Sequence, residues 1–519
     1  MNQKTFDFSF VIFSILVAVL GAIIGMQIIT TLGITPNTSI IGALIAIVIA
    51  KIPMQMFYKY KSIDNQNLVQ TTISAATFGA ANSLLIPIGI PFVLGRSDLI
   101  IPMLIGSGVA LIIDALILYK VFDSKLFGAD ETWPPGVATA EALKAGDQGG
   151  ARAKFLGFGI LGGLVGSWAG IPMSAFGVAF IGNIWALSMF GVGLLIKGYA
   201  EPMFNINLDS YYIPHGMMIG AGMIALIQFI LAMRKKDNGQ TDESKQNHVY
   251  TRTDKDVRQG FGLGFAAYVG GAVLLALLGG LMSELSFGKL ILFILFAAFA
   301  ALASEIIVGI AAMHSGWFPA FAVTLISLII GMMLGFPPLA LALLVGYTAA
   351  TGPAFADLGY DFKSGVLIRQ ANTEMELYGR KMQLISAMIG FVVAIVMVAA
   401  FHHVFFAKDL VPPVDRVYAT TIEAGLSGNT AKMLFLWAIP GALIQLIGGS
   451  KRQMGILLAT GLLIFNPLAG WAVIVGLIIR VVVLKVRGPE AENTMYTTAA
   501  GFIAGDALYS FFTSIWKAR

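Results

Sequence analysis

The segment Trp133–Asp147, WPPGVATAEALKAGD, has a divergent copy at Pro412–Lys432, PPVDRVYATTIEAGLSGNTAK. Both copies begin with two prolines and continue through an Ala-Thr pair to a single glutamate, Glu141 or Glu423. Each then passes through a stretch rich in glycine and alanine to a lysine that precedes an apolar segment. A polar segment that occurs twice in a very apolar chain predicts two related halves.

The composition restricts the class of protein. Hydrophobic residues make up 57% and charged residues 12% of the 519 residues, and the mean hydropathy is +0.83. In soluble domains about a quarter of all residues are charged. With 12% charged residues, this chain has too few to cover a water-facing surface. Phe10–Thr30 and Gln383–Phe401 contain no charged residue and are long enough, at about 18–20 residues, to cross a bilayer. We therefore expect an all-α polytopic membrane protein rather than a β-barrel, whose strands give shorter alternating segments.

The hydropathy pattern predicts about 16 transmembrane helices, with some broken or re-entrant segments among them. The expected spans are 8–31, 39–58, 67–93, 98–122, 153–176, 177–197, 210–233, 259–284, 288–312, 317–336, 337–358, 381–404, 431–449, 452–467, 468–486 and 495–516. Gly166–Phe180 and Phe336–Pro353 are rich in glycine and proline, and are the segments we expect to be re-entrant. The first span is longer than the apolar core of a signal peptide, so we expect it to be retained as a helix.

Positively charged loops predict the orientation. Lys51, Lys59 and Lys61 lie in one short loop, and Arg234–Lys236 and Arg487 directly follow apolar spans. The positive-inside rule then places the N-terminus and the polar loop 234–258 in the cytoplasm, in a multi-pass protein of the plasma (cytoplasmic) membrane. The mixed charges of that loop are typical of a solvated linker, and a regulatory site is the alternative.

Further matching segments support a duplication. Gly95-Arg96 and Gly379-Arg380 are each followed at the same spacing by an Ile-Gly pair, Ser74–Thr77 matches Thr348–Thr351, and Tyr211–Gly220 matches Tyr496–Gly505. The matches occur in the same order in both halves. We predict transmembrane repeat one at 1–235, a cytoplasmic linker with an additional helix at 236–284, and transmembrane repeat two at 285–519. Whether the repeats are parallel or inverted stays open at this stage.

Several kinds of site are missing from the sequence. The chain has no cysteine, which excludes disulfides, thiolate metal sites and iron–sulfur clusters. Walker A, GxSxG and HExxH patterns are also absent, so we expect neither an ATP-driven pump nor an enzyme, and no cofactor or bound metal. The adjacent pair His402-His403 points in two directions on a helix and forms a poor chelate. The net charge of +5 does not indicate nucleic-acid binding, because basic residues in such a chain mark cytoplasmic loops.

Ionisable residues within apolar spans are the first group of functional candidates, because a charge inside a bilayer usually faces a wet cavity or a partner. Imidazole titrates near neutral pH, so an acid and a histidine near one another can pass a proton. The proton-coupling candidates are Glu305, Asp506, His215 and Asp357. For each, a helix-packing hydrogen bond is the alternative role. Asp114 lies near a span end, and we expect that structural role for it.

Polar residues at helical spacing form the second group. They either line a pathway or hold neighbouring helices together. The substrate-binding candidates are Asn67, Gln70, Thr71, Ser74, Asn82 and Thr348. The duplicated segment supplies the third group, as a gate or hairpin with a cytoplasmic connector as the alternative. The gate candidates are Pro134, Pro135, Glu141 and Glu423.

Several stretches of the chain resemble conserved blocks of the oligopeptide transporter (OPT) family. They are TLGITPNTSIIGALI (31–45), NQNLVQTTISAATFGAANSLLIPIGI (65–90), WPPGVATAEALKAGD (133–147) and DFKSGVLI (361–368) before the Arg380 helix. The chain is most similar to the prokaryotic branch, related to the yellow-stripe-like metal-chelate transporters. The resemblance implies a secondary transporter that imports small peptides or peptide-like metal chelates together with protons.

Alternatives to proton-coupled symport remain. A sodium-coupled symporter of another small organic solute would use carbonyl and hydroxyl oxygens, which the chain has in plenty. A passive channel would give flux without accumulation, and a membrane-embedded enzyme would need a catalytic cluster that the sequence does not show. The expected partners are a small-molecule substrate, protons and the lipid bilayer, with a homo-oligomer left open and no nucleic acid.

Overall fold

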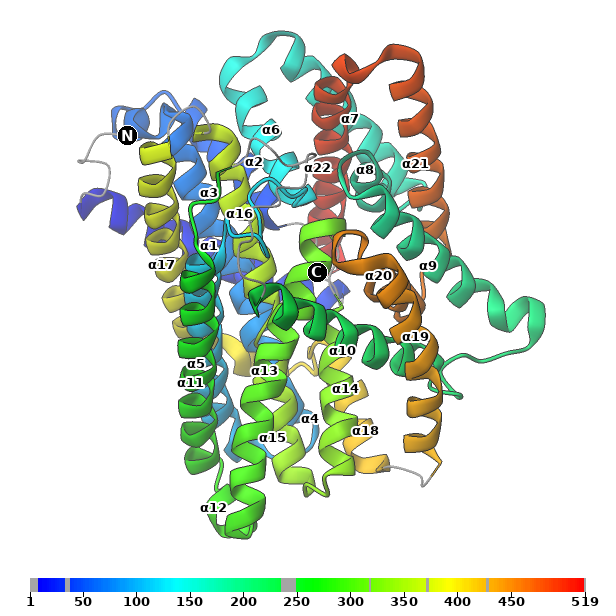
Figure 1. Ribbon diagram of the computed structural model, residues 1–519. Coiled ribbons are helices and arrows are strands. Elements are labelled where there is room, and N and C mark those ends of the chain that lie inside the picture. Colours follow the sequence, from blue (N-terminus) through cyan, green and yellow to red (C-terminus); the bar gives the residue numbers. More distant parts are fainter. Residues whose placement is uncertain are drawn as a thin grey trace.

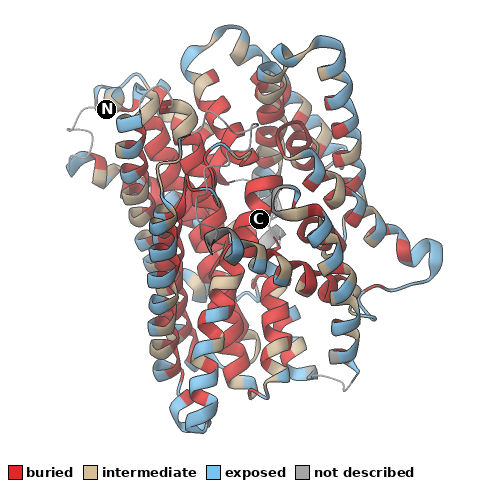
Figure 2. Cartoon of the chain, viewed as in Figure 1, coloured by how far each residue is buried: buried red, intermediate tan, exposed pale blue. Residues whose placement is uncertain are grey.

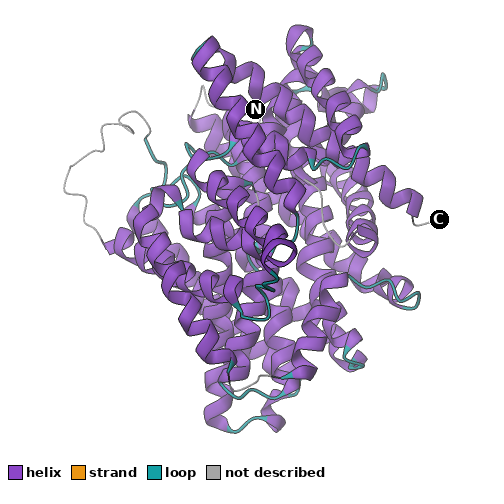
Figure 3. Cartoon of the chain, turned by 90° about the vertical axis from the view of Figure 1, so that its right-hand side faces the viewer, coloured by secondary structure: helices purple, strands orange, loops and turns teal. Residues whose placement is uncertain are grey.

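The computed structural model describes residues 8–32, 38–234, 249–316, 319–369, 373–425 and 429–517. These residues are helical almost throughout, and none of them forms a strand (Figure 3). The all-α fold class is therefore confirmed. Residues 235–248, all but the first of which belong to the expected linker, and residues 33–37 of the first family-like block lie outside the described part of the chain.

The helices follow one another closely along the chain. In chain order they are α1 (Phe8–Leu32), α2 (Thr38–Lys51), η1 (Gln55–Lys61), α3 (Ile63–Phe78), η2 (Gly79–Leu85), α4 (Ile86–Val93), η3 (Ser97–Leu99), α5 (Ile100–Val121), α6 (Pro134–Gln148), α7 (Gly150–Trp168), α8 (Met173–Ile181), α9 (Ile184–Phe204), α10 (Ile213–Arg234), α11 (Asp254–Leu278), α12 (Leu281–Glu284), α13 (Phe287–Ser315), α14 (Ala320–Met333), α15 (Pro338–Ala349), α16 (Pro353–Arg369), α17 (Thr373–Phe406), α18 (Pro413–Ala424), α19 (Thr430–Arg452), α20 (Met454–Leu463), α21 (Pro467–Arg487), η5 (Pro489–Ala491) and α22 (Glu492–Lys517).

Long apolar helices dominate the fold. Within the described residues, nine helical segments are long and apolar enough to cross a membrane, and four shorter apolar helices accompany them. Both segments expected to be re-entrant are interrupted helices. The first turns at Gly170, with a φ of +82°, and the second at Gly352, with a φ of +87°, a conformation that glycine adopts without strain. Such breaks leave backbone donors and acceptors of the helix ends available inside the protein.

Burial separates an outer shell of helices from an inner group (Figure 2). Large apolar side chains of the outer helices are exposed, among them Phe158, Leu161 and Trp168 of α7. An apolar outer surface of this extent suits contact with lipid. In contrast, 89% of the most apolar window in the α3–α4 segment and 94% of that in the α15–α16 segment are buried. These two segments form the centre of the bundle.

Helices of the first half of the chain pack directly against helices of the second half. α7 packs on α22, and α10 packs on α19. Glycines allow this close approach: a Cβ atom at Gly159 would lie 2.8 Å from the Cα atom of Gly501. α6 and α7 lie at the top of Figure 1, whereas α18 and α19 lie towards the bottom. The two copies of the duplicated segment are thus at opposite ends of the molecule.

Candidate functional site

The inner helix α16 begins in the interior of the protein, directly after the break at Gly352. Asp114 of α5 accepts hydrogen bonds from the backbone N–H of Gly352, at 3.1 Å to each carboxylate oxygen, and from that of Phe355, at 2.8 Å. A carboxylate at this position satisfies free N–H groups and complements the positive end of the helix dipole. Asp114 therefore fixes the start of α16.

A second acid lies beside this cap. The hydroxyl of Tyr268 donates a hydrogen bond to Glu305 Oε2, at 2.9 Å, and lies 3.5 Å from Asp114 Oδ1. Tyr347 in turn donates to the backbone carbonyl of Tyr268, at 3.0 Å. All these side chains are buried, and within the described residues Glu305 Oε1 has no hydrogen-bond partner. The predicted proton-coupling residue Glu305 is therefore one of two buried acids that share the hydroxyl of Tyr268.

A larger polar cluster fills the interface between α3 and α16. Asp357 accepts hydrogen bonds from Thr38, at 2.8 Å, and from Ser74, at 3.0 and 2.9 Å to its two oxygens. Asp361, one helical turn further along α16, accepts from Ser39, at 2.8 Å, and from Gln70. Ser39 also lies 3.5 Å from Asp357. The two carboxyl groups thus lie on one face of α16 and share a hydroxyl.

The cluster continues to the far end of α16. Asn67 donates a hydrogen bond to Ser364, at 2.8 Å, and accepts one from Arg369, at 3.0 Å. Gln383 of α17 accepts from Arg369, at 2.7 Å, and donates to Thr71, at 3.1 Å. We call this set the α3–α16 polar network. Its members are Thr38, Ser39, Asn67, Gln70, Thr71, Ser74, Asp357, Asp361, Ser364, Arg369 and Gln383, and all of them are buried.

Of the predicted substrate-binding residues, those on α3 join this network. Asn67, Gln70, Thr71 and Ser74 all form hydrogen bonds with α16 or α17, as their helical spacing suggested. The other two candidates lie outside it. Asn82 is half-buried in η2, and Thr348 donates a hydrogen bond to Leu344 O in its own helix, α15.

The predicted proton-coupling residues fall at separate places. Asp357 belongs to the α3–α16 polar network, whereas Asp506 of α22 accepts hydrogen bonds from the Ser167 hydroxyl and from the backbone N–H of Ser174, at 2.9 Å for the latter. His215, at the start of α10, packs against the ring of Tyr212, with 5.9 Å between ring centroids. The structure therefore does not bring Asp506 and His215 together with Asp357.

Several members of the network were missed by sequence reasoning. The most informative of them is Asp361, which follows Asp357 by four residues and therefore shares its face of the helix. That spacing was visible in the sequence. Ser39 and Gln383 gave no comparable signal, because only the packing of α2 and α17 against the α3–α16 pair brings them in. Arg369 ends α16 itself and joins the network through Asn67 and Gln383.

The gate candidates divide between the two ends of the molecule. Pro134 and Pro135 are buried at the start of α6 and follow Trp133, whose φ of +38° is unusual for a bulky residue. Trp133 is held in this conformation by hydrogen bonds from its backbone N–H to Met313 O, at 2.8 Å, and from Nε1 to Gly128 O, at 3.0 Å. The start of α6 is thereby tied to the end of α13.

The two gate glutamates differ in their surroundings. Glu141 of α6 is buried, accepts a hydrogen bond from Thr497 at 2.9 Å, and lies 3.3 Å from Arg152 and 3.6 Å from Lys144. Glu423, its counterpart at the end of α18, is exposed. The buried Glu141 thus connects α6 to α22. The surroundings of the exposed Glu423 differ from this arrangement.

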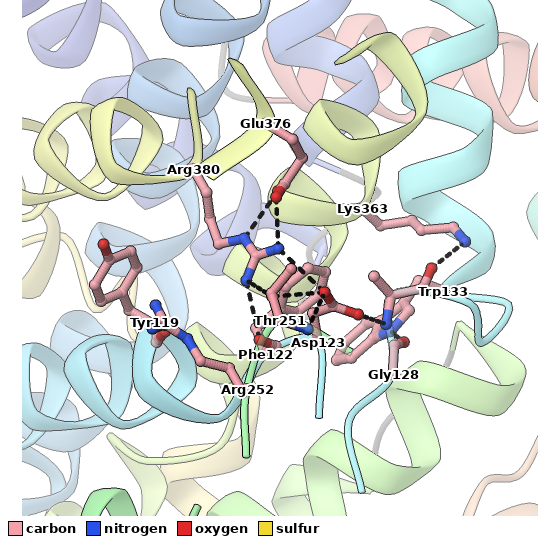
Figure 4. A network of polar contacts seen from close by, with 11 residues as sticks. Tyr119, Phe122, Asp123, Gly128, Trp133, Thr251, Arg252, Lys363, Glu376 and Arg380 are labelled. Atoms are coloured by element: carbon pink, nitrogen blue, oxygen red, sulfur yellow. Dashed lines mark hydrogen bonds and ion pairs between the residues drawn. The ribbon is translucent and has the colours of Figure 1, made fainter. Parts of the chain in front are cut away.

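A network of charged residues surrounds the loop that leads into α6 (Figure 4). Arg380 of α17 donates to both oxygens of Glu376, at 2.8 and 2.7 Å, and to Phe122 O, at 3.1 Å. Asp123 lies 3.6 Å from Arg380 and accepts two hydrogen bonds from Thr251, the backbone one at 3.1 Å and the hydroxyl one at 2.6 Å.

The same loop is held from α16. Lys363 Nζ donates hydrogen bonds to the backbone carbonyls of Ala129, at 2.7 Å, and Glu131, at 2.9 Å. Figure 4 shows the side chain of Lys363 directed towards this loop. We call Arg380, Glu376, Asp123, Thr251 and Lys363 the α6 latch. It joins Thr251, which precedes α11, to the loop before α6 and to the helices α16 and α17.

Two cavities of the structure lie away from these polar residues. A groove of about 400 Å³ is lined by apolar residues of α10, α14 and α19, and a smaller cavity of about 90 Å³ lies between α10, α13 and α14. No member of the α3–α16 polar network lines either space. All members of the network are buried, so their side chains are shielded from solvent in this conformation. In addition, no three His, Asp or Glu side chains in the described residues are grouped closely enough to hold a metal ion.

Long apolar helices around interrupted inner helices that carry buried acids define a polytopic membrane transporter. The family model for the OPT oligopeptide transporter protein matches residues 6–233 and 210–517. The chain therefore belongs to the OPT family of oligopeptide transporters. No curated protein matches it.

Proposed function

We propose that this OPT-family protein is a proton-coupled symporter that carries small peptides or peptide-like metal chelates into the cell. The observation that carries the proposal is the pair Asp357 and Asp361. Both acids are buried, and the hydrogen bonds they receive come from neutral hydroxyl and amide groups. Two adjacent carboxylates in such surroundings hold at least one proton between them, because a second uncompensated charge is costly.

The proposed coupling follows from the need to compensate that charge. When the pair faces the outside of the cell, one carboxyl group takes up a proton and the other pairs with a bound cationic group, so that both charges are compensated and the loaded pair can be buried; proton and substrate are then released together on the cytoplasmic side. A peptide supplies an ammonium group for this purpose. The amides of Asn67 and Gln70, which are now used within the network, are suited to hydrogen bonds with a peptide backbone once the helices part.

We further propose that repeats one and two, at 1–235 and 285–519, are inverted. The support comes from the packing of corresponding residues. A Cβ atom at Gly216 would lie 2.7 Å from Leu434 O, and a Cβ atom at Gly501 would lie 2.5 Å from Leu156 O. Gly501 follows Gly216 by 285 positions and Leu434 follows Leu156 by 278 positions, so each contact joins one half of the chain to the other in reciprocal fashion. Because α7 and α19 lie at opposite ends of the molecule (Figure 1), the axis relating the halves would lie in the membrane plane.

Inverted halves suit alternating access, in which one bundle rocks against the other around a fixed site. In this proposal α6 closes one side of the α3–α16 polar network and α18 closes the opposite side. The positive-inside pattern assigns the N-terminus to the cytoplasm, with the protein in the plasma membrane.

Reconstitution into liposomes tests the proposal. A thermal-shift screen with short peptides and metal chelates first identifies a ligand, because a ligand that binds the folded state raises its stability. An imposed inward proton gradient should then drive accumulation of that ligand, and a protonophore should abolish it. Accumulation that follows a sodium gradient and is unaffected by the protonophore would contradict the proposal.

The variant Asp361→Asn separates coupling from binding. The amide cannot release a proton, so we expect loss of uphill accumulation while exchange of internal for external substrate continues. Asp98→Asn is the matched control, since Asp98 is an exposed aspartate that pairs with Arg96 at 2.8 Å. It should behave like the unchanged protein in both assays.

A sodium-coupled symporter is the second candidate. The observation in its favour is the group of hydroxyls from Thr38, Ser39 and Ser74 around Asp357, because oxygen ligands of this kind also suit a hard monovalent cation. The ion gradients in the liposome experiment distinguish the two candidates directly.

A further inference from the structure

Asp415, in the first turn of α18, is a buried acid that neither the α3–α16 polar network nor the α6 latch includes. Its side chain is fully buried. Neither of its carboxylate oxygens has a hydrogen-bond partner in the described part of the chain. This differs from Asp357, whose two oxygens both accept hydrogen bonds.

The helix α4 makes room for this carboxylate. Asp415 Oδ2 occupies the place where a side chain on Gly89 would begin, so that any larger residue at position 89 would displace it. A charged residue also packs over a helical glycine at the other end of the molecule. There the charged residue comes from the inner helix, as Lys363 of α16 packs over Gly136 of α6, with 2.7 Å between Lys363 Cβ and a Cβ built at Gly136.

The two contacts differ in how the charge is compensated. Lys363 donates hydrogen bonds to two backbone carbonyls, whereas Asp415 has no such partner. The helices packed on α18 offer no charge: α4 and α14 carry no titratable residue, and α15 carries only Tyr347, whose hydroxyl is directed to Tyr268 O. On α18 itself, Arg416 is half-exposed and pairs with Asp409 at 2.8 Å, and Glu423 is exposed.

Polar groups close to Asp415 add a second observation. Tyr418, one turn further along α18, donates a hydrogen bond to Phe321 O of α14 at 3.2 Å. Thr324, one turn further along α14, lies beside Tyr418, and its buried hydroxyl has no hydrogen bond of good geometry. Unsatisfied oxygens of Asp415 and Thr324 on facing helices are costly unless a proton or another donor accompanies them.

We propose that Asp415 is a second proton-binding site, which carries a proton while α18 is packed on α4 and loses it when α18 moves away. The bound proton makes the carboxyl group neutral, and burial is then tolerated. Release of the proton creates a charge that has no partner at Gly89, so α18 separates from α4 and that side of the protein opens. The inference rests on the proposed proton-coupled transport, but its test measures the position of α18 and requires no transport.

The absence of cysteine from the chain allows a sharp test by single-cysteine labelling. Ala419→Cys places a thiol on the buried face of α18, and Glu423→Cys places one at its exposed end. Both proteins are treated in liposomes with a membrane-impermeant maleimide. The labelling rate of the first is divided by that of the second, which removes the pH dependence of the thiol reaction itself. We expect this ratio to rise about tenfold from about pH 5.5 to about pH 8, because deprotonation shifts α18 towards the separated state.

The variant Asp415→Asn assigns the effect to this residue. An amide resembles the protonated carboxyl group in shape, so the ratio should stay low at all pH values. The variant Gly89→Ala provides an independent arm: it displaces the carboxylate, and the ratio should be high even at low pH. A ratio that does not change with pH in the otherwise unchanged protein overturns the proposal, whether or not Asp415→Asn folds.

Two further outcomes are informative. A pH dependence that persists in Asp415→Asn would overturn the assignment to Asp415, and a ratio that responds to sodium at constant pH would replace the proton by a metal cation. If transport proves to be driven by sodium while the ratio still depends on pH and on Asp415, the proposed coupling fails and the inference about Asp415 stands.

Discussion

Ser74 Oγ lies 3.0 Å from one carboxylate oxygen of Asp357 and 2.9 Å from the other, so that a single hydroxyl of α3 faces both oxygens of an acid on α16. The residues are 283 positions apart in the chain. This contact joins the inner helices of the two halves at the acid pair on which the proposed coupling depends.

The variant Ser74→Ala is therefore predicted to change the pH dependence of transport. Hydrogen bonds from Ser74 and Thr38 stabilise the charged form of Asp357, and loss of one donor makes release of the proton harder. A hydrogen bond to a charged group contributes about 1.5–3 kcal/mol, so the pH profile of transport should shift to higher pH by about one to two units. Initial uptake rates in liposomes over a range of pH give the shift. Ser74→Thr, which keeps the hydroxyl, is the control, and equal shifts in both variants would count against this role.

The α6 latch is predicted to stabilise the protein strongly. Arg380→Met leaves Glu376 and Asp123 buried without their cation, a change that typically costs about 3–5 kcal/mol. Arg96→Met removes an exposed ion pair with Asp98, which contributes about 1 kcal/mol or less. Thermal unfolding of the purified proteins in detergent compares the two. Similar losses of stability in both variants would show that the buried pairs contribute no more than the exposed one.

The close contact of α7 with α22 is predicted to tolerate no side chain at Gly163. A Cβ atom there would lie 2.9 Å from Gly505 Cα, so Gly163→Val must separate the helices and should cost about 1–3 kcal/mol. Gly157 lies in the same helix, but a Cβ atom on it would have no atom within 4 Å. Gly157→Val is thus the matched control for helix propensity. The same thermal measurement applies, and an equal effect of both substitutions would exclude packing as the cause.

Glu305, which is buried, and Asp506, which is partly buried, are predicted to contribute to coupling. Glu305→Gln and Asp506→Asn retain size and a hydrogen-bond acceptor but cannot exchange a proton. Each should reduce accumulation driven by a proton gradient by about tenfold or more, with folding unchanged, if it carries a proton during the cycle. Uptake with and without the gradient measures the effect. If both variants keep accumulation and its pH dependence, the assignment of Glu305 and Asp506 as proton sites is wrong.

Sequence reasoning reached part of the candidate site. The spacing of Asn67, Gln70, Thr71 and Ser74 predicted one polar face on a helix, and this face forms hydrogen bonds in the structure. Helical periodicity is a local property, so a single sequence reveals it. Asp357, which that face contacts, was predicted as a proton-coupling residue and not as its partner, and Asp361 was overlooked despite its spacing.

The grouping of the acids could not be obtained from the sequence. Glu305, Asp506, His215 and Asp357 were grouped because each interrupts an apolar span. In the fold, Asp506 is held by Ser167 and Ser174, whereas Glu305 shares Tyr268 with Asp114. Hydropathy indicates whether a residue lies within an apolar span of the sequence, but it does not indicate which helix packs beside that residue.

The sequence by itself determined that this protein is a membrane-embedded helical bundle with interrupted inner helices and a duplicated polar segment, because hydropathy, helical spacing and Gly/Pro breaks act over a few neighbouring residues. Only the tertiary structure decided that Asp114 caps α16 from 238 positions away and that Ser74 meets Asp357. It also decided that Asp415 is buried against Gly89 without a hydrogen-bond partner in the described residues. These contacts result from the close packing of helices from both halves, which no local pattern specifies.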